Sequence, residues 1–255
     1  MRYLFLGNGK LGANILEWLC QRDEPPVGVA LHQGSRLREG ERLRSLAAEF
    51  KLPILDGSRL NAEDVFSEVA RLRPDAGVSV MFGYLLKQPF LDLFPKGCVN
   101  LHTSLLPFNR GVHPNVWAIV DGTPAGVTLH LIDSGVDTGP VIAQEEVEVE
   151  PVDTGKTLYE KLEAAAVNLF ATSWPRVMAG NYSPIPQPRE AGTSHRLGDL
   201  STLDEIDLDE PCTARRVIDV LRARTFPPHA GSYFIHNGRK VFLRLELEYA
   251  DEEGP

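Results

Sequence analysis

Short apolar segments alternate with longer helical patterns through the first half of the chain, and this rhythm constrains the fold more than any other feature. Residues 2–6, 27–31 and 76–81 are apolar runs typical of buried strands, while residues 11–20 and 39–50 have the pattern of helices. Strands that are apolar throughout and alternate with helices are typical of a parallel sheet covered on both faces. We therefore expect an α/β protein with a Rossmann-like, mostly parallel sheet.

The second half predicts the end of this domain and a smaller one after it. A long helical pattern ends near Met178, and three prolines follow within residues 181–200, which is typical of an exposed linker. Residues 201–255 then predict a small α+β domain with a hairpin across Asn237-Gly238. We expect a catalytic domain at 1–180, a linker at 181–200 and a C-terminal domain at 201–255.

Composition narrows the class of protein. The 255 residues are 43% apolar, enough for a sizeable core, and contain no uninterrupted apolar run of eighteen residues. The start of the chain lacks the pattern of a secretory leader. Three widely separated cysteines without CxxC spacing favour a reducing, cytoplasmic location over a disulfide framework or a zinc ribbon. A net charge of −9 makes bulk nucleic acid an unfavourable partner.

Three glycines follow the first expected strand in the spacing Gly-x-Gly-x-x-Gly. Such a turn can cradle a phosphate on backbone N–H groups or simply allow tight packing. A dinucleotide site would add an acidic residue at the end of the second strand, where this chain has Leu31-His32-Gln33-Gly34, so NAD is disfavoured. Close packing around Gly7, Gly9 and Gly12 and substrate contact by Gly7, Asn8, Gly9 and Lys10 both stay open.

The segment from Asn100 to Gly139 carries the strongest signal for chemistry. Asn100 and His102 alternate with apolar residues on an expected strand, so the period of two directs both side chains to one face. An amide donor beside a histidine is suited to stabilising an oxyanion and moving a proton. Asp137 lies in a glycine-rich turn, where a carboxylate can orient the histidine or stabilise its cation. Each residue alone also fits an ordinary strand end or turn, so the interpretation depends on all three.

The order of these motifs resembles that of the 10-formyltetrahydrofolate-dependent formyltransferases. The sequence NLHTSLLP at residues 100–107, Arg110-Gly111 and Gly135-x-Asp137-x-Gly139 carry the resemblance. The resemblance is specific between residues 100 and 140. Over residues 1–180 it consists of the same order of expected strands and helices. The resemblance implies that Asn100, His102 and Asp137 are catalytic, that 10-formyltetrahydrofolate is the cofactor and that no metal is needed.

The same resemblance, together with exposed apolar residues in the loop after the strand at 98–102, suggests where ligands bind. Cofactor contacts are expected from Phe82, Gly83, Tyr84, Leu85, Leu86, Leu105, Leu106, Pro107 and Asp133. Substrate contacts are expected from Ser104, Arg110 and His113 as well as from the glycine turn. His113 replaces the small or apolar residue common before this proline; it either faces the substrate or is bonded to loop backbone.

Within the family, the chain looks most similar to the nucleotide-sugar N-formyltransferases. LRARTFPP at 221–228, GSYF at 231–234 and HPNVWAI at 113–119 carry this likeness. Residues 201–255 form a shorter segment than the tRNA-binding domain of methionyl-tRNA formyltransferases. They hold seven Lys and Arg against eleven Asp and Glu, a net charge of −4 that disfavours binding to tRNA. Arginines of the expected helix there either meet a pyrophosphate or form a solvated face paired with Asp219: Arg215, Arg216, Arg222 and Arg224.

These observations predict transfer of a formyl group from 10-formyltetrahydrofolate to the amine of a nucleotide-linked amino sugar. His102 takes the amine proton, Asn100 and protonated His102 hold the oxyanion, and Asp137 orients His102. The alternatives are a methionyl-tRNA or small-amine formyltransferase, a hydrolase, an NAD-dependent oxidoreductase and an inactive ligand-binding module. We expect a homodimer without a nucleic-acid or membrane partner.

Overall fold

The computed structural model describes residues 1–188 and 190–250, which group into two compact units. The first unit comprises residues 1–102, 127–145 and 165–187, and the second comprises residues 103–126, 146–164 and those from 188 onward. Residue 189 of the predicted linker and residues 251–255 of the predicted C-terminal domain lie outside the described residues. The domain limits expected at residues 180 and 200 stay a prediction.

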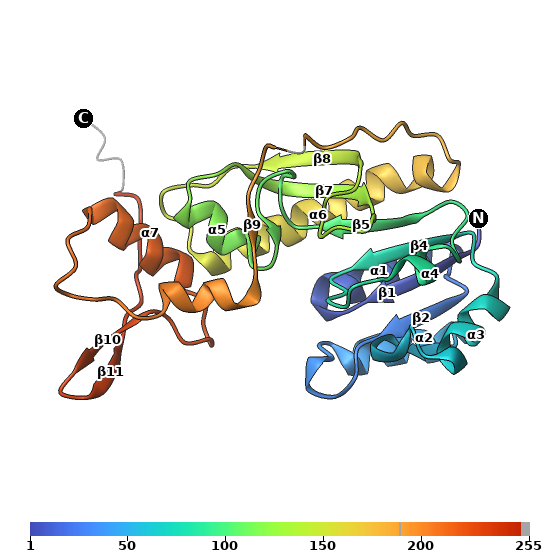
Figure 1. The fold of residues 1–255 in the computed structure, drawn as a ribbon, viewed down its shortest axis with the longest axis horizontal. Coiled ribbons are helices and arrows are strands. Elements are labelled where there is room, and N and C mark those ends of the chain that lie inside the picture. Colours follow the sequence, from blue (N-terminus) through green and yellow to red (C-terminus); the bar gives the residue numbers. More distant parts are fainter. Residues whose placement is uncertain (189, 251–255) are drawn as a thin grey trace. The chain divides into compact units, whose positions relative to one another are not determined.

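A seven-stranded sheet organises the first unit, in the order β3-β2-β1-β4-β5-β7-β8 (Figure 1). The five strands from β3 to β5 are parallel, and β7 is antiparallel to β5. The predicted mostly parallel α/β fold is therefore confirmed. The strands are β1 (Tyr3–Gly7), β2 (Gly28–Leu31), β3 (Ile54–Asp56), β4 (Ala76–Val80), β5 (Cys98–His102), β7 (Ala125–Leu131) and β8 (Val141–Val147).

Helices bury both faces of this sheet because alternate residues of its strands point to opposite sides. Leu4 and Leu6 of β1 belong to a buried cluster that includes Val65 and Phe90 from the helices that follow β3 and β4. Tyr3 instead meets the ring of Trp174 edge-on, with the ring centroids 5.0 Å apart. The helices are α1 (Gly9–Gln21), α2 (Gly40–Glu49), α3 (Glu63–Leu72), α4 (Gln88–Leu91) and α6 (Gly155–Met178).

The second unit contains α5 (Pro114–Val120), α7 (Ala214–Arg224) and a hairpin of β10 (Tyr233–His236) and β11 (Arg239–Phe242). The hairpin turns at Asn237 and Gly238, both of which have positive φ, as a two-residue turn requires. Two short strands, β6 (Arg110–Gly111) and β9 (Ser194–His195), pair in parallel. Within residues 1–188 and 190–250, no helix is both long and apolar enough to cross a membrane.

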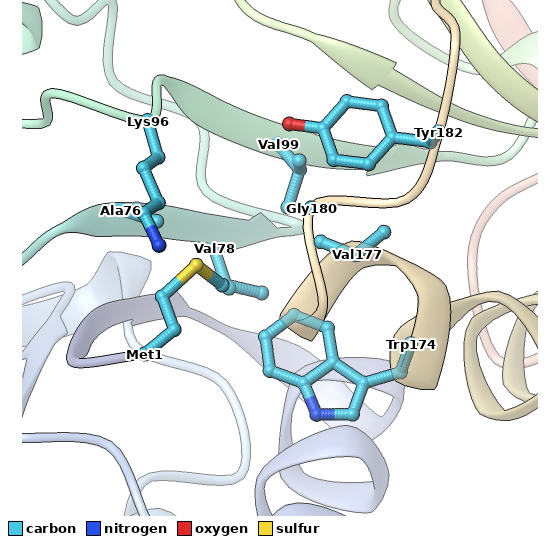
Figure 2. A pocket seen from close by; sticks show the side chains of 10 residues that line it. Met1, Ala76, Val78, Lys96, Val99, Trp174, Val177, Gly180 and Tyr182 are labelled. Atoms are coloured by element: carbon cyan, nitrogen blue, oxygen red, sulfur yellow. The ribbon is translucent and has the colours of Figure 1, made fainter.

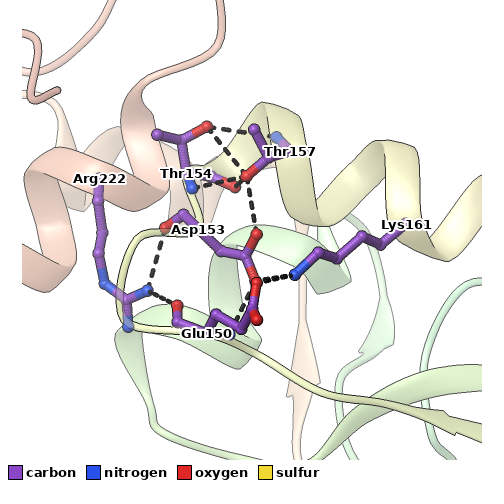
Figure 3. A network of polar contacts seen from close by, with 6 residues as sticks. All are labelled: Glu150, Asp153, Thr154, Thr157, Lys161 and Arg222. Carbon is purple, nitrogen blue, oxygen red and sulfur yellow. Dashed lines mark hydrogen bonds and ion pairs between the residues drawn. The ribbon is translucent and has the colours of Figure 1, made fainter. Parts of the chain in front are cut away.

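A polar network ties α7 to α6 within the second unit (Figure 3). The carboxylate of Asp153 accepts hydrogen bonds from Lys161 Nζ at 2.8 Å and Thr157 Oγ1 at 3.0 Å. Arg222 of α7 donates to the backbone carbonyls of Glu150 and Asp153 at 3.1 and 3.0 Å. Asp153 is buried, so these partners are what make its charge tolerable there.

Candidate active site

Asn100, His102 and Asp137 come together in the first unit. Asn100 and His102 end β5, and Asp137 lies in the turn between β7 and β8. One carboxylate oxygen of Asp137 is 3.4 Å from Asn100 Nδ2, and the other is 3.7 Å from His102 Nε2. The side chains of His102 and Asp137 are 11% and 15% exposed. The carboxylate is therefore placed to act on both of the other residues at a site open to solvent.

His130 is a further member of this group, and the sequence analysis missed it. The register of β5 and β7 places His130 opposite Asn100, and its Nε2 is 3.1 Å from Asn100 Nδ2. The other ring nitrogen, Nδ1, is 2.8 Å from the carbonyl of Leu131. A carbonyl only accepts, so in the neutral ring Nδ1 carries the hydrogen and Nε2 is the acceptor. His130 thereby orients the Asn100 amide with its nitrogen toward the ring.

A period-two signal for His130 is present in the sequence. Thr128 and His130 are polar residues that alternate with Val127 and Leu129 on a predicted strand, so they share one face. The register that sets this face beside Asn100 and His102 comes from pairing between β5 and β7, which are far apart in the chain. Local pattern carries no information on that pairing.

The turn that carries Asp137 is held tightly. Asp137 has φ +53°, in the left-handed region, and a Cβ on Gly139 would lie 1.8 Å from the carbonyl oxygen of Leu131. Gln187 Nε2 donates to the carbonyls of Asp137 and Gly139 at 2.9 and 2.7 Å. Gln187 was expected in an exposed linker, yet it fixes the backbone that positions the carboxylate.

Asp133, expected to contact the cofactor, stabilises the same turn. Its Oδ1 accepts from Thr138 Oγ1 at 2.6 Å and from the backbone N–H of Gly135 at 2.9 Å. These are the bonds of an Asx-type turn. The structure thus shows a turn-forming role for this carboxylate, and its contact with a cofactor stays a prediction.

The predicted cofactor segment, Met81–Leu86, follows β4 and contains both buried and exposed apolar side chains. Leu86 is 7% exposed and joins the buried cluster, whereas Leu85 is 66% exposed. Phe82 and Tyr84 are half-buried, with ring centroids 5.5 Å apart. Exposed aliphatic and aromatic groups on a turn at the carboxyl end of a parallel strand fit a flat organic ring, because ligands of such sheets bind at that edge.

The glycine turn after β1 is engaged by its own chain. Asn8 Oδ1 accepts from the N–H of Arg38 at 2.8 Å, and Asn8 Nδ2 donates to the carbonyl of Arg36 at 3.1 Å. The N–H of Gly9 donates to the carbonyl of Arg38 at 3.3 Å. The Gly9 N–H and the Asn8 amide N–H are the donors that this turn would otherwise offer to a phosphate. Gly7 is buried and Lys10 is exposed; contact of this turn with a substrate stays a prediction.

The other expected ligand contacts belong to the second unit. The loop after β5 was expected to expose its apolar side chains, but Leu106 is buried, as is Ser104, and Leu105 and Pro107 are half-buried. Arg110 lies in β6. His113 precedes α5 with φ +55°. Its pKa is lowered by burial, and the nearby charges of Arg224 and His229 lower it further. Loss of its proton is therefore favoured within this unit.

The arginines of α7 make contacts within the second unit. Arg222 Nε is 2.8 Å from Asp219 Oδ1, Arg224 pairs with Asp204, and Arg216 donates to the carbonyl of Val120 at 3.2 Å. The pair of Arg222 with Asp219 fits the predicted paired helix face, and contact of these arginines with a pyrophosphate stays a prediction.

A cavity of about 300 Å³ lies in the first unit away from these residues (Figure 2). Val78 and Val99 of β4 and β5 line it together with Trp174 and Val177 of α6. Val99 directly precedes Asn100, so its side chain projects from the opposite face of the sheet. The cavity is therefore separate from the group formed by Asn100, His102, His130 and Asp137.

Two family models match the chain. The formyl transferase model matches residues 11–173, and the model of the N-formyltransferase dimerization C-terminal domain matches residues 199–249. The chain belongs to the formyl transferase family. It is an N-formyltransferase, and the resemblance drawn from Asn100–Gly139 is confirmed.

Individual relatives agree on this class and differ in acceptor. A methionyl-tRNA formyltransferase of Geotalea daltonii is 30% identical over 260 residues, covering 100% of this chain and 81% of the relative. The structure of a 4-N formyltransferase from Francisella tularensis is 29% identical, covers 98% and 99% of the two chains, and has a TM-score of 0.80. A formyltransferase from Anoxybacillus kamchatkensis, solved with UDP-4,6-dideoxy-4-formamido-L-AltNAc and tetrahydrofolate, is 28% identical, covers 79% and 89%, and has a TM-score of 0.57.

Proposed function

We propose that the protein transfers a formyl group to the primary amine of a nucleotide-linked amino sugar. The observation that carries the proposal is the convergence of Asn100, His102 and Asp137 at the ends of β5 and the turn after β7. The amino-sugar acceptor is supported by the A. kamchatkensis structure, which was solved with a formamido-sugar nucleotide.

The formyl donor is 10-formyltetrahydrofolate, as the family membership implies. When bound, it supplies an activated formyl group on a nitrogen atom. The segment Met81–Leu86 fits its ring system, because Met81 and Leu85 are exposed apolar side chains beside the half-buried rings of Phe82 and Tyr84. Burial of such side chains by a flat ligand contributes roughly 25 cal/mol per Å² of apolar surface.

Each of the three site residues has a distinct role in this proposal. Asn100 offers an amide N–H toward negative charge that develops on the formyl oxygen. His102 would take the proton that the amine loses as its nitrogen bonds to the formyl carbon. The bond from that carbon to the donor nitrogen would then break, and the proton would pass from His102 to that nitrogen as tetrahydrofolate leaves. Asp137, 3.7 Å from His102 Nε2, orients the ring and stabilises the positive charge that the ring gains during the reaction. Removal of one such donor typically costs about a hundredfold to a thousandfold in rate.

A methionyl-tRNA acceptor is the second candidate, favoured by the 30% identity to the G. daltonii enzyme. Residues 201–255 disfavour it, because their net charge of −4 opposes binding of a polyanion. Clustered Lys and Arg side chains release counterions from a nucleic acid, and Arg222 and Arg224 of α7 instead pair with Asp219 and Asp204.

We also propose a homodimer through the C-terminal hairpin. Ile235 and Phe242 are 44% and 53% exposed, and the register places both on the face of the hairpin that carries Tyr233. Exposed apolar side chains gathered on one face are typical of an interface. The match to a dimerization domain model supports this assignment.

The decisive experiment compares acceptors at a fixed concentration of 10-formyltetrahydrofolate. The panel consists of UDP- and dTDP-linked 3-amino and 4-amino sugars, glycinamide ribonucleotide and methionyl-tRNA, with formylated product measured by mass spectrometry. We expect kcat/KM for one nucleotide-linked amino sugar to exceed that of the other acceptors by at least a hundredfold. Preferential formylation of methionyl-tRNA, with nanomolar to micromolar binding that weakens steeply with salt, would contradict the proposal.

A further inference from the structure

We infer that His32 is a positioning residue that holds the cofactor segment Met81–Leu86 in its binding conformation. The inference rests on the proposed function, since that segment is the proposed folate contact. His32 follows β2, and it lies in neither the catalytic group nor the predicted ligand contacts. Its role comes from what its ring contacts.

The ring of His32 bridges two strands that are not neighbours. β1 lies between β2 and β4 in the sheet. His32, at the end of β2, nevertheless accepts a hydrogen bond at Nε2 from the N–H of Gly83, after β4, at 3.1 Å. His32 is 6% exposed. Because β1 lies between β2 and β4, the His32 side chain reaches across the carboxyl end of β1 and fixes the backbone in the middle of the cofactor segment.

The bond to Gly83 requires one protonation state of His32. Because Nε2 accepts, it carries no hydrogen, and the single ring proton of a neutral histidine lies on Nδ1. Nδ1 is 3.1 Å from the Asn8 amide nitrogen, which itself donates to the Arg36 carbonyl, and the ring also bonds to the backbone of Arg36. The Gly83 N–H, which can only donate, thus sets Nε2 as the accepting nitrogen.

Aromatic packing adds to the hydrogen bond. The His32 ring centroid is 5.2 Å from that of Phe82 and 4.6 Å from that of Tyr84. The guanidinium of Arg36 lies over Tyr84 at 5.5 Å from its centroid. His32 therefore contacts both half-buried rings of the segment, and these are the rings proposed to face the cofactor.

Protonation of His32 would disrupt this arrangement. The groups around its ring are Asn8 after β1, Arg36 after β2, and Phe82, Gly83 and Tyr84 after β4. Burial lowers the pKa of His32, the bond to the Arg36 backbone raises it, and the Arg36 charge lowers it again, so the net direction is downward. A lowered pKa favours the neutral ring, the form that accepts from Gly83. As the pH falls below the pKa, a hydrogen on Nε2 would face the N–H of Gly83, and the segment would lose its anchor.

Two substitutions at His32 separate the acceptor from the charge. His32→Leu removes the acceptor, whereas His32→Gln supplies a carbonyl oxygen near the position of Nε2 without a group that titrates. The probe is 5-formyltetrahydrofolate, whose Kd is measured by calorimetry from pH 5.5 to 8. His236→Leu, at an exposed position in β10, is the matched control for the loss of a histidine.

For the wild type we expect Kd to rise severalfold as the pH falls through the lowered pKa of His32. His32→Leu should raise Kd about tenfold at pH 7.5 and speed hydrogen exchange at the Gly83 amide. His32→Gln should keep Kd within about threefold of wild type at pH 7.5 and weaken less at low pH. kcat with saturating donor should change less than Kd in both variants, because His102 is untouched.

The outcomes distinguish this inference from the proposed function. Wild-type protein that binds no folate at pH 7.5 would overturn both. Folate binding with the same Kd and pH profile in wild type, His32→Leu and His32→Gln would overturn the role of His32 alone. If His32→Leu does not fold, His32→Gln still decides, since a full wild-type pH dependence in that variant would show that another group titrates.

Discussion

Asn100 and His130 lie directly opposite each other on β5 and β7, with Nδ2 of the amide 3.1 Å from Nε2 of the ring. The bond from His130 Nδ1 to the Leu131 carbonyl fixes which ring nitrogen accepts, and the accepting nitrogen fixes which way the amide faces. The amide proposed to stabilise the formyl oxygen is thus oriented by a neighbour that is itself almost fully buried. The pairing of β5 with β7 therefore orients the Asn100 amide without a bound ligand.

His130→Leu should lower kcat about fivefold and leave the Kd for folate within about threefold. The lost hydrogen bond is worth about 1 kcal/mol, which is about a fivefold change in rate if it is lost wholly from the transition state. Steady-state kinetics with both substrates varied give the split between kcat and KM. His130→Gln, which restores an acceptor, should recover part of kcat; equal loss in both variants would point to packing instead.

His102→Asn should reduce kcat by at least a hundredfold while the thermal midpoint stays within about 2 °C. The His102 side chain is 11% exposed and lies outside the packed core, so its loss removes a proton acceptor without creating a large cavity. Single-turnover rates at pH 7.5 are the measurement. A variant that keeps more than about a tenth of wild-type rate would exclude His102 as the general base.

Asp137→Asn should lower the rate of the chemical step while folate Kd changes only a few fold. Asparagine tolerates the left-handed backbone found at this position, φ +53°, so the turn is retained and only the charge is lost. Asp137→Ala adds backbone strain and serves as the contrast in thermal unfolding. Collapse of folate binding with a normal single-turnover rate at saturation would reassign Asp137 as a cofactor contact.

The fold was predictable because its signals are local. Apolar runs and helical periods mark strands and helices that the structure places within one or two residues of the expected limits, as at Ala76–Val80 and Gly40–Glu49. Short elements carry too few residues for a periodic signal, so β3 and α4 were not anticipated. The Asn237-Gly238 turn was predicted, because the positive φ needed at both positions favours Asn and Gly.

The site was predictable only in part, for a related reason. Asn100 and His102 share a strand, so a period of two suffices to place them together. His130 and Gln187 reach the site through contacts at a distance: one through the register of β5 with β7, the other through hydrogen bonds to carbonyls 48 and 50 residues earlier. A period of two places His130 on the polar face of its strand, but no local pattern shows which strand that face meets or where Gln187 binds.

Asp153→Asn should destabilise the second unit by about 1 to 3 kcal/mol, because it weakens charge-assisted bonds to a buried group. Burial lowers the pKa of Lys161, but its bonds to Asp153 and Glu150 outweigh this and raise it overall. A raised lysine pKa stabilises the fold below its unfolded pKa of about 10.5, and this contribution is lost as pH rises through the folded pKa. Urea unfolding should therefore show a gap between wild type and variant at pH 7.5 that narrows above pH 10.5. A constant gap would assign the loss to packing.

Phe242→Lys should convert a dimer to a monomer without unfolding the chain. Phe242 is 53% exposed and shares a hairpin face with Ile235 and Tyr233, so a charge there would be buried unpaired in a dimer and solvated in a monomer.

The matched control is His236→Lys, which places the same charge on the opposite face of the same hairpin, at an exposed position. Light scattering coupled to size exclusion, at several protein concentrations, measures the mass of each. We expect a dimer for wild type and control and a monomer for Phe242→Lys, with the thermal midpoint used to exclude misfolding. A wild-type monomer, or a Phe242→Lys dimer as tight as the control, would place the interface on another surface or remove it.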